Sequence, residues 1–322
     1  MRLGNESDFE AKKNLSDEGS PVARGNPVGA GVSEPRRPWG RADRNRLLIW
    51  FGIGFILPGI FVFASHLQGK PSEAVFSVRS ELPVKFILAF AVFAATWIVS
   101  RMEKRPLDDY GIPLRRAFGL RFWEGLIWGF AMLSAILLII RASGDFQIDS
   151  VALTGAAAWR QALGWAIVFY CVAIHEEFAF RGYLLFSFAR RFRFWPAAIV
   201  SSAIFAVAHL GNPGENILGI LQVFVTGMIF CLTIRRTGTL WFAVGFHAAW
   251  DWAETFFYGT PDSGLLGVGR LLNTSVHGPN WLTGGSAGPE GSVMAFLILI
   301  IFAGIIHFRF PRAIYADRPA QE

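Results

Sequence analysis

The chain has 322 residues, of which 53% are hydrophobic, and its mean hydropathy is +0.40. This composition excludes an ordinary soluble domain and indicates a protein that crosses a membrane several times. The net charge of +6 does not point to nucleic-acid binding, because the basic residues cluster in short loops between apolar segments.

Residues 1–46 are polar and rich in Gly, Pro, Ser and charge, so we expect a disordered cytoplasmic tail. Residues 47–310 form one membrane domain with eight apolar segments, each near the length of about 20 residues that a bilayer requires. The segments are 47–67, 84–100, 123–140, 163–189, 195–209, 217–234, 240–257 and 293–308. Residues 311–322 are expected to form a second cytoplasmic tail.

The loops between these segments alternate between rich and poor in Lys and Arg. The positive-inside rule then predicts an all-α, polytopic helical bundle in the cytoplasmic membrane, with both termini cytoplasmic. The Gly-rich stretch 258–292 is expected to be an outer loop. Within the third segment, Gly125 and Gly129 form a small-xxx-small pair, which predicts close packing on a neighbouring helix.

The fourth segment carries two adjacent carboxylates, Glu176 and Glu177, followed by Arg181. A charged side chain at the bilayer centre costs about 2.5–3.5 kcal/mol on insertion scales, so this pair needs a compensating reason. Glu177 and Arg181 share one helix face and can form an ion pair. Glu176 is then rotated by about 100° around the helix axis, which leaves it free for chemistry.

Two later segments carry further polar groups, which are His209 in the fifth and His247 with Asp251 in the seventh. At 1.5 Å per residue, all of them can meet Glu176 near the middle of the membrane. Glu176 could act as a general base on water, and His209 could hold that water. His247 and Asp251 could stabilise an oxyanion. This set of groups suits hydrolysis of an amide bond.

Each motif alone also has a structural explanation, as an ion pair, an interfacial histidine or an interhelical hydrogen bond. Together they favour function, because about 1–2 kcal/mol per hydrogen bond would hardly offset the burial of several ionisable groups.

Metal chemistry stays an open alternative at this stage. The run after His175 is not the zincin motif, because Ala179 stands where the second His belongs. Even so, the four groups Glu176, His209, His247 and Asp251 could ligate zinc. Few polar residues remain to support such a site, so we expect no cofactor.

The motifs Glu176-Glu177-x-x-x-Arg181, Phe205-x-x-x-His209 and His247-x-x-x-Asp251 resemble, in this order, the three motifs of the CPBP family. That family comprises CAAX prenyl endopeptidases and bacteriocin-processing or self-immunity proteins, also called Abi. The stretches 109–113 (Asp-Tyr-Gly-Ile-Pro) and 288–291 (Gly-Pro-Glu-Gly) also look like bacterial members. The likeness covers roughly residues 105–308.

The resemblance implies an eight-helix intramembrane endopeptidase with Glu176 as base and His209 sharing the water. His247 and residue 251 would form the oxyanion site. The prenyl endopeptidases carry Asn at this last position, whereas this chain has Asp251. An ionised Asp cannot donate a hydrogen bond to an oxyanion, so Asp251 must be protonated, orient His247 or bind a cation.

We therefore expect a membrane hydrolase that cleaves a peptide or protein substrate near the bilayer, with no nucleic-acid partner. The alternative is a non-catalytic immunity or scaffold protein that binds a partner through the same polar cavity. A proton-coupled carrier is a third option, which the lack of a visible inverted repeat disfavours. The sequence leaves the oligomeric state and the prenylation of the substrate open.

Overall fold

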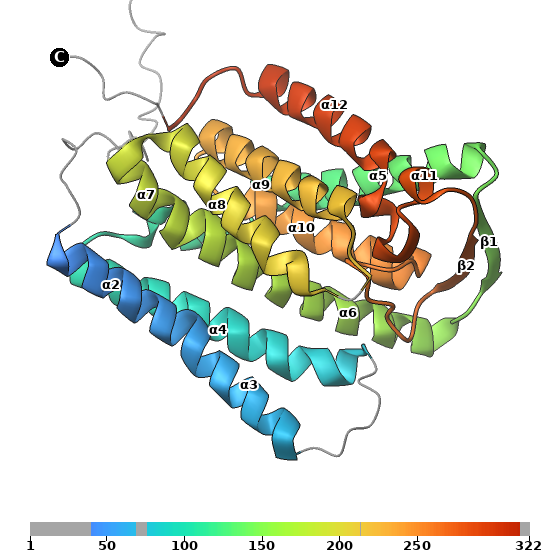
Figure 1. Ribbon diagram of the computed structural model, residues 1–322, viewed down its shortest axis with the longest axis horizontal. Helices are drawn as coiled ribbons and strands as arrows, with labels where there is room; N and C mark the ends of the chain where they lie inside the picture. Colours follow the sequence, from blue (N-terminus) through green and yellow to red (C-terminus); the bar gives the residue numbers. More distant parts are fainter. Residues whose placement is uncertain (1–39, 69–75, 213, 316–322) are drawn as a thin grey trace, which may run out of the picture.

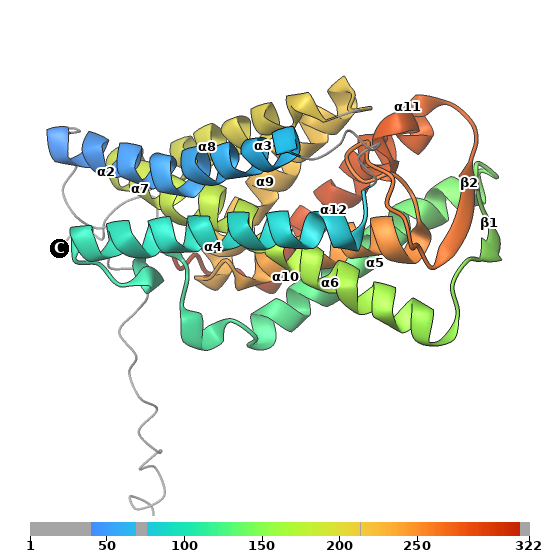
Figure 2. The same ribbon diagram turned by 90° about the horizontal axis from the view of Figure 1, so that it is seen from below.

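The computed structural model describes residues 40–68, 76–212 and 214–315. The molecule is a bundle of helices, with a small two-stranded sheet at the end opposite α7 (Figures 1 and 2). The α-helices are α2 (Arg41–Phe51), α3 (Leu57–Gln68), α4 (Val78–Glu103), α5 (Leu120–Ala142), α6 (Gly155–Glu176), α7 (Leu185–Phe192), α8 (Phe194–Ala208), α9 (Ile217–Thr237), α10 (Trp241–Trp252), α11 (Asn280–Thr283) and α12 (Val293–Arg309). Three π-helical segments extend them: η2 (Gly52–Ile56), η5 (Glu177–Leu184) and η7 (Ala253–Tyr258).

All eight apolar segments of the sequence are helical in the structure. Within the described residues, six helical runs are long and apolar enough to cross a membrane. These runs are Arg41–Phe61, Val78–Glu103, Leu120–Ala142, Gly155–Phe192, Phe194–Gly211 and Ile217–Thr237, and Val293–Arg309 is a shorter apolar helix. A polytopic helical membrane bundle is therefore confirmed. The count of eight crossings and the cytoplasmic placement of the termini stay predictions.

The sheet departs from the all-α expectation. Strand β1 (Phe146–Val151) pairs antiparallel with β2 (Leu272–Val276), with an irregularity in the register between Ile148 and Ser150. Strand β2 lies in the Gly-rich stretch 258–292 that we expected to be an outer loop, and β1 lies between the third and fourth apolar segments. The pairing satisfies backbone groups of two exposed connections, and it places those two loops side by side at one end of the bundle (Figure 1).

The boundaries of the expected tails also change. Helix α2 begins at Arg41, six residues before the expected first span, so the expected tail can extend only to Gly40, and its residues 1–39 lie outside the described part. At the other end, Tyr315 is buried, and its ring contacts Phe186 and Phe194. The chain therefore packs on the bundle for several residues beyond α12, and residues 316–322 lie outside the described part.

Helices α5 and α10 pack backbone against backbone at three glycines. A Cβ atom at Gly125 would lie 2.1 Å from the carbonyl oxygen of Phe242, and one at Gly129 would lie 2.1 Å from that of Phe246. Gly245 of α10 approaches the Phe122 carbonyl oxygen of α5 equally closely. The close packing predicted from Gly125 and Gly129 is thus confirmed, and it fixes the height of α10 in the bundle.

Glu103, at the end of α4, contacts polar side chains of η5, of α7 and of the connection that follows α4. Its carboxylate accepts hydrogen bonds from the hydroxyls of Tyr110 (2.6 Å) and Tyr183 (3.2 Å). It also pairs with Arg190 at 3.0 Å. Since Tyr183 belongs to η5 and Arg190 to α7, this network holds the end of the π-helical segment against α4.

Candidate active site

The adjacent carboxylates lie where α6 changes into a π-helix. Glu176 is the last residue of α6, and Glu177 is the first residue of η5. The backbone departs from helical geometry at Gly182, with φ −83° and ψ −105°. π-Helical turns insert extra backbone into a helix and often occur at functional sites. Here the widened turn carries Glu177 and Arg181, the pair that the sequence places one turn apart.

Glu177 and Arg181 form a fully buried ion pair. Arg181 Nη1 lies 3.3 Å from Glu177 Oε1, and neither side chain is exposed. Two other nitrogens of the guanidinium make no hydrogen bond to the described residues. Its carbon instead lies 3.9 Å from the centre of the Phe205 ring, with Phe180 and Phe230 also near. Aromatic faces therefore stabilise the part of the cation that Glu177 does not reach.

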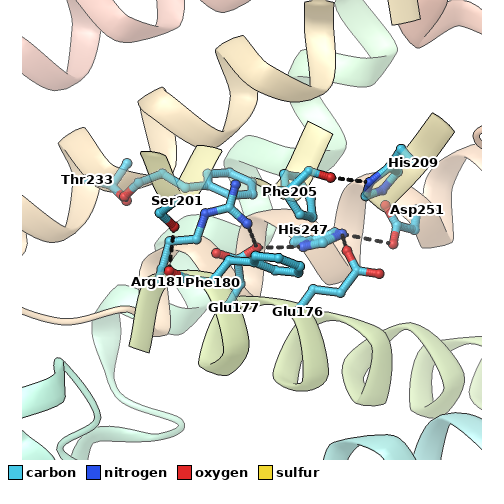
Figure 3. Close-up of polar contacts among 11 residues, drawn as sticks. Glu176, Glu177, Phe180, Arg181, Ser201, Phe205, His209, Thr233, His247 and Asp251 are labelled. Carbon is cyan, nitrogen blue, oxygen red and sulfur yellow. Dashed lines mark hydrogen bonds and ion pairs between the residues drawn. The ribbon is translucent and has the colours of Figure 1, made fainter. Parts of the chain in front are cut away.

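His247 of α10 stands between the acidic residues (Figure 3). Its Nδ1 lies 2.9 Å from Glu177 Oε1. Its Nε2 lies 3.6 Å from Glu176 Oε2 and 3.5 Å from Asp251 Oδ2. Both ring nitrogens thus face carboxylates, which only accept hydrogen bonds when ionised. Glu177 receives both Arg181 and His247, so its charge is compensated twice.

Glu176 is less constrained than its neighbour. Its side chain is 19% exposed, compared with 0% for Glu177. Its Oε2 is buried and has no hydrogen-bond partner among the described residues, with His247 as an ion-pair neighbour at 3.6 Å. The expected ion pair of Glu177 with Arg181 is thus present, whereas the availability of Glu176 for chemistry stays a prediction.

His209 enters the site from the end of α8. Its Nδ1 lies 2.9 Å from the backbone carbonyl oxygen of Phe205, one turn earlier. Because a carbonyl oxygen only accepts, Nδ1 carries the proton, and in the neutral ring Nε2 is an acceptor. Figure 3 shows His209 beside Asp251, at the end of the group opposite Arg181.

A cavity of about 380 Å³ joins these residues. Glu176, His209, His247 and Asp251 all contribute to its wall. The cavity wall also includes His175, Gln222 and Thr226, the polar residues that the sequence offers as support for the site. The sequence analysis missed five further polar groups of the wall, which are Lys85, Asn212, Asp262, Ser263 and Glu290. Aromatic and aliphatic side chains line the rest, among them Phe55 of η2, Phe169 of α6 and Val223 of α9. The cavity can therefore hold both a water molecule and an apolar chain.

The structure brings together all six residues singled out from the sequence: Glu176, Glu177, Arg181, His247 and Asp251 through direct contacts or close approach, and His209 through the shared cavity. These six residues do not form the cluster of possible metal ligands that the described part of the chain contains. That cluster consists of Glu254, Asp262 and Glu290, whose ligand atoms lie within 4.8 Å of one another. Asp262 and Glu290 come from the Gly-rich stretch 258–292, where only the Gly-Pro-Glu-Gly run gave a signal.

Known proteins resemble this chain over the same region. A family model described as type II CAAX prenyl endopeptidase Rce1-like matches residues 158–253, which include all six residues. An uncharacterized 24.3 kDa protein of Escherichia coli is 30% identical over 205 residues, which cover 62% of this chain and 88% of that protein. The uncharacterized protein YyaK of Bacillus subtilis strain 168 is 24% identical over 236 residues, covering 70% of this chain and 74% of that protein.

Proposed function

Because this chain belongs to the CPBP family, of which the Rce1-like type II CAAX prenyl endopeptidases are members, we propose that it is an intramembrane endopeptidase with Glu176 as general base. One observation carries this assignment of the base. The Glu176 side chain is 19% exposed and lines the cavity, whereas the Glu177 side chain is fully buried and its Oε1 is engaged by Arg181 and His247.

In the proposed reaction, Glu176 accepts a proton from a water molecule as the water oxygen attacks the carbonyl carbon of the scissile peptide bond. Nε2 of His209 accepts a hydrogen bond from the same water, since its Nδ1 is engaged by the Phe205 carbonyl. The proton on Glu176 then passes to the leaving nitrogen as the C–N bond breaks. The products are a carboxylic acid and an amine.

The negative charge that forms on the carbonyl oxygen needs a donor. His247 can supply it from Nε2–H when both ring nitrogens are protonated, and its Nδ1–H then donates a hydrogen bond to Glu177. Asp251 then acts through His247, which it holds at 3.5 Å, and this role does not require it to donate a hydrogen bond. The replacement of the Asn of prenyl endopeptidases by Asp251 is compatible with this arrangement.

The substrate is, in this proposal, a peptide or protein segment that reaches the cavity from the cytoplasmic membrane. The apolar wall at Phe55, Phe169 and Val223 fits aliphatic or prenyl chains, and the polar end presents the peptide bond to Glu176. The reaction uses no metal at Glu176 in this scheme. The comparison of prenylated with unprenylated peptides tests whether the substrate carries a prenyl chain.

The test uses purified protein in lipid nanodiscs with internally quenched peptides, each made with and without a farnesylated cysteine near the C-terminus. We expect cleavage by the wild type and loss of cleavage in Glu176→Gln. Asp149→Asn, an exposed carboxylate of β1 outside the cavity, is the matched control and should cleave normally.

Peptide binding without cleavage by the wild type would contradict the proposal and favour the scaffold alternative. A second assay repeats the reaction after exhaustive chelation and with zinc returned. The metal-free scheme would be contradicted if activity ended on chelation and returned with stoichiometric zinc. The same result is required in Glu290→Gln, because Glu290 belongs to the separate carboxylate cluster and not to the Glu176 group.

A further inference from the structure

Three carboxylates outside the Glu176 group lie together within the connection between α10 and α12. Glu254 belongs to η7, Asp262 to the turn that follows it, and Glu290 to the 3-10 helix η9 (Pro289–Gly291). One oxygen from each lies within 4.8 Å of the others. Oxygens bound to one Ca²⁺ at about 2.3–2.6 Å can be separated by at most roughly 5.2 Å, so this spacing fits a common ion.

Glu254 is the observation that points to a ligand. Its side chain is 0% exposed, and both carboxylate oxygens are buried without a hydrogen-bond partner at normal geometry, although the Trp250 indole approaches. The ionisable groups that act on it are all acidic: Glu290, Asp262 and Asp251. A buried carboxylate without donors is strongly destabilising unless a proton or a cation compensates it.

The other two carboxylates are held in position from behind. Glu290 Oε1 accepts hydrogen bonds from the backbone N–H of Ser263 (2.7 Å) and from its hydroxyl (2.6 Å). Asp262 Oδ2 accepts one from the Thr255 hydroxyl (3.0 Å). Carboxylates that ligate metals are typically oriented by such hydrogen bonds.

We propose that Glu254, Asp262 and Glu290 bind a divalent cation that prefers oxygen ligands, such as Ca²⁺, Mg²⁺ or Mn²⁺. The set contains only carboxylates, which suit these ions better than zinc. Asp262 and Glu290 also line the cavity, from which water can complete the coordination shell. The ion would tie η7, the turn at Asp262 and η9 into one wall of the cavity, and it is separate from the water at Glu176.

If the ion binds, it orders the cavity wall that η7, the turn at Asp262 and η9 form. The three ligands come from segments up to 36 residues apart, from Glu254 to Glu290. Gly288 packs against this region, since a Cβ there would lie 2.0 Å from the Pro261 carbonyl oxygen and 3.1 Å from Glu254 Oε1. Bound cation would therefore stabilise the outer connection as a unit.

Terbium luminescence tests the site, because Tb³⁺ replaces Ca²⁺ at carboxylate sites and Trp250 lies close enough to excite it. The experiment uses the full chain in nanodiscs and titrates Tb³⁺, followed by displacement with Ca²⁺, Mg²⁺ or Mn²⁺. We expect one ion per chain and an increase of the thermal midpoint with Ca²⁺. Glu254→Gln, which keeps the shape of the side chain, should weaken binding at least about tenfold, whereas Asp149→Asn should bind as the wild type.

Two outcomes would overturn the proposal. One is no binding with up to about 10 mM Ca²⁺ at pH 8, well above the millimolar affinity of weak calcium modules. The other is equal affinity in the wild type and Glu254→Gln. Because binding is read without proteolysis, the same titration in Glu176→Gln separates failure of the cation site from failure of the proposed peptidase function.

Discussion

The chain buries two groups of carboxylates within one bundle, and they differ in how their charge is compensated. Around Glu177, the protein supplies the cations itself, through Arg181 at 3.3 Å and His247 at 2.9 Å. Around Glu254, the neighbouring charges are acidic, and no hydrogen bond of normal geometry reaches its oxygens from the described residues, although the Trp250 indole approaches. The first group is compensated permanently, whereas the second must take a proton or a cation from outside and so responds to the solution.

The first prediction concerns Glu176 and separates a loss of catalysis from a loss of charge compensation in the group around Glu177. Glu176→Ala should lower kcat/KM by about 10²–10⁴-fold, because it removes the general base. The thermal midpoint should change little, since Glu176 Oε2 makes no hydrogen bond to a described residue. Cleavage of the quenched peptides and differential scanning fluorimetry measure the two quantities, and a large loss of stability would contradict the assignment.

Glu177→Ala should have the opposite effect. It leaves Arg181 buried without its carboxylate, and breaking such a pair costs about 3–5 kcal/mol. We expect low yield and a large fall in the thermal midpoint, measured beside Glu176→Ala. The double variant Glu177→Leu/Arg181→Met should recover part of the loss, because it removes both charges. Equal destabilisation by the two single alanine variants would contradict this division.

The group of Glu254, Asp262 and Glu290 should make the stability of the protein depend on pH. Burial, reinforced by Asp262, raises the pKa of Glu290 to about 8, whereas a glutamate in an unfolded chain titrates near pH ~4.3. Between these values the folded protein binds more protons than the unfolded chain, so its stability falls as pH rises, by up to about 1.4 kcal/mol per pH unit. Above pH ~8 this contribution is lost and the dependence flattens.

Thermal midpoints in a chelator, measured from pH ~5 to ~9, test this dependence. The titratable groups that face Glu290 are Glu254 and Asp262 in the group, Asp251 on α10 and Glu215 before α9. Glu290→Gln should flatten the curve, and Ca²⁺ added at pH ~8 should restore stability in the wild type. A wild-type curve that rises over this range would contradict the expected sign.

The last prediction should disturb the protein least and concerns the side of the membrane that each group faces. Cysteine in place of Arg115 should react with reagents from the cytoplasm, and cysteine in place of Asp149 or His277 should react from outside. These three positions are exposed in the structure. Cytoplasmic labelling of His277 would contradict the eight-span topology.

The sequence was sufficient to predict the helical bundle. An apolar segment of about 20 residues in a bilayer must satisfy its backbone hydrogen bonds internally, and the α-helix does so within one segment. The Glu177–Arg181 pair and the packing face at Gly125 and Gly129 follow from the same local periodicity. Each of these features depends on residues close together in the chain, so the sequence could specify it directly. The catalytic roles of the site residues stay predictions.

The tertiary structure decided which groups meet across helices. His247 contacts Glu177 over a separation of 70 residues, and this contact depends on the packing of α10 against α6. The π-helical turn at Glu177 and the pairing of β1 with β2 likewise depend on neighbours distant in sequence. The cluster of Glu254, Asp262 and Glu290 shows this dependence on the tertiary structure most clearly. Asp262 and Glu290 come from a stretch without hydrophobic periodicity, and only the folded connection brings their oxygens to Glu254.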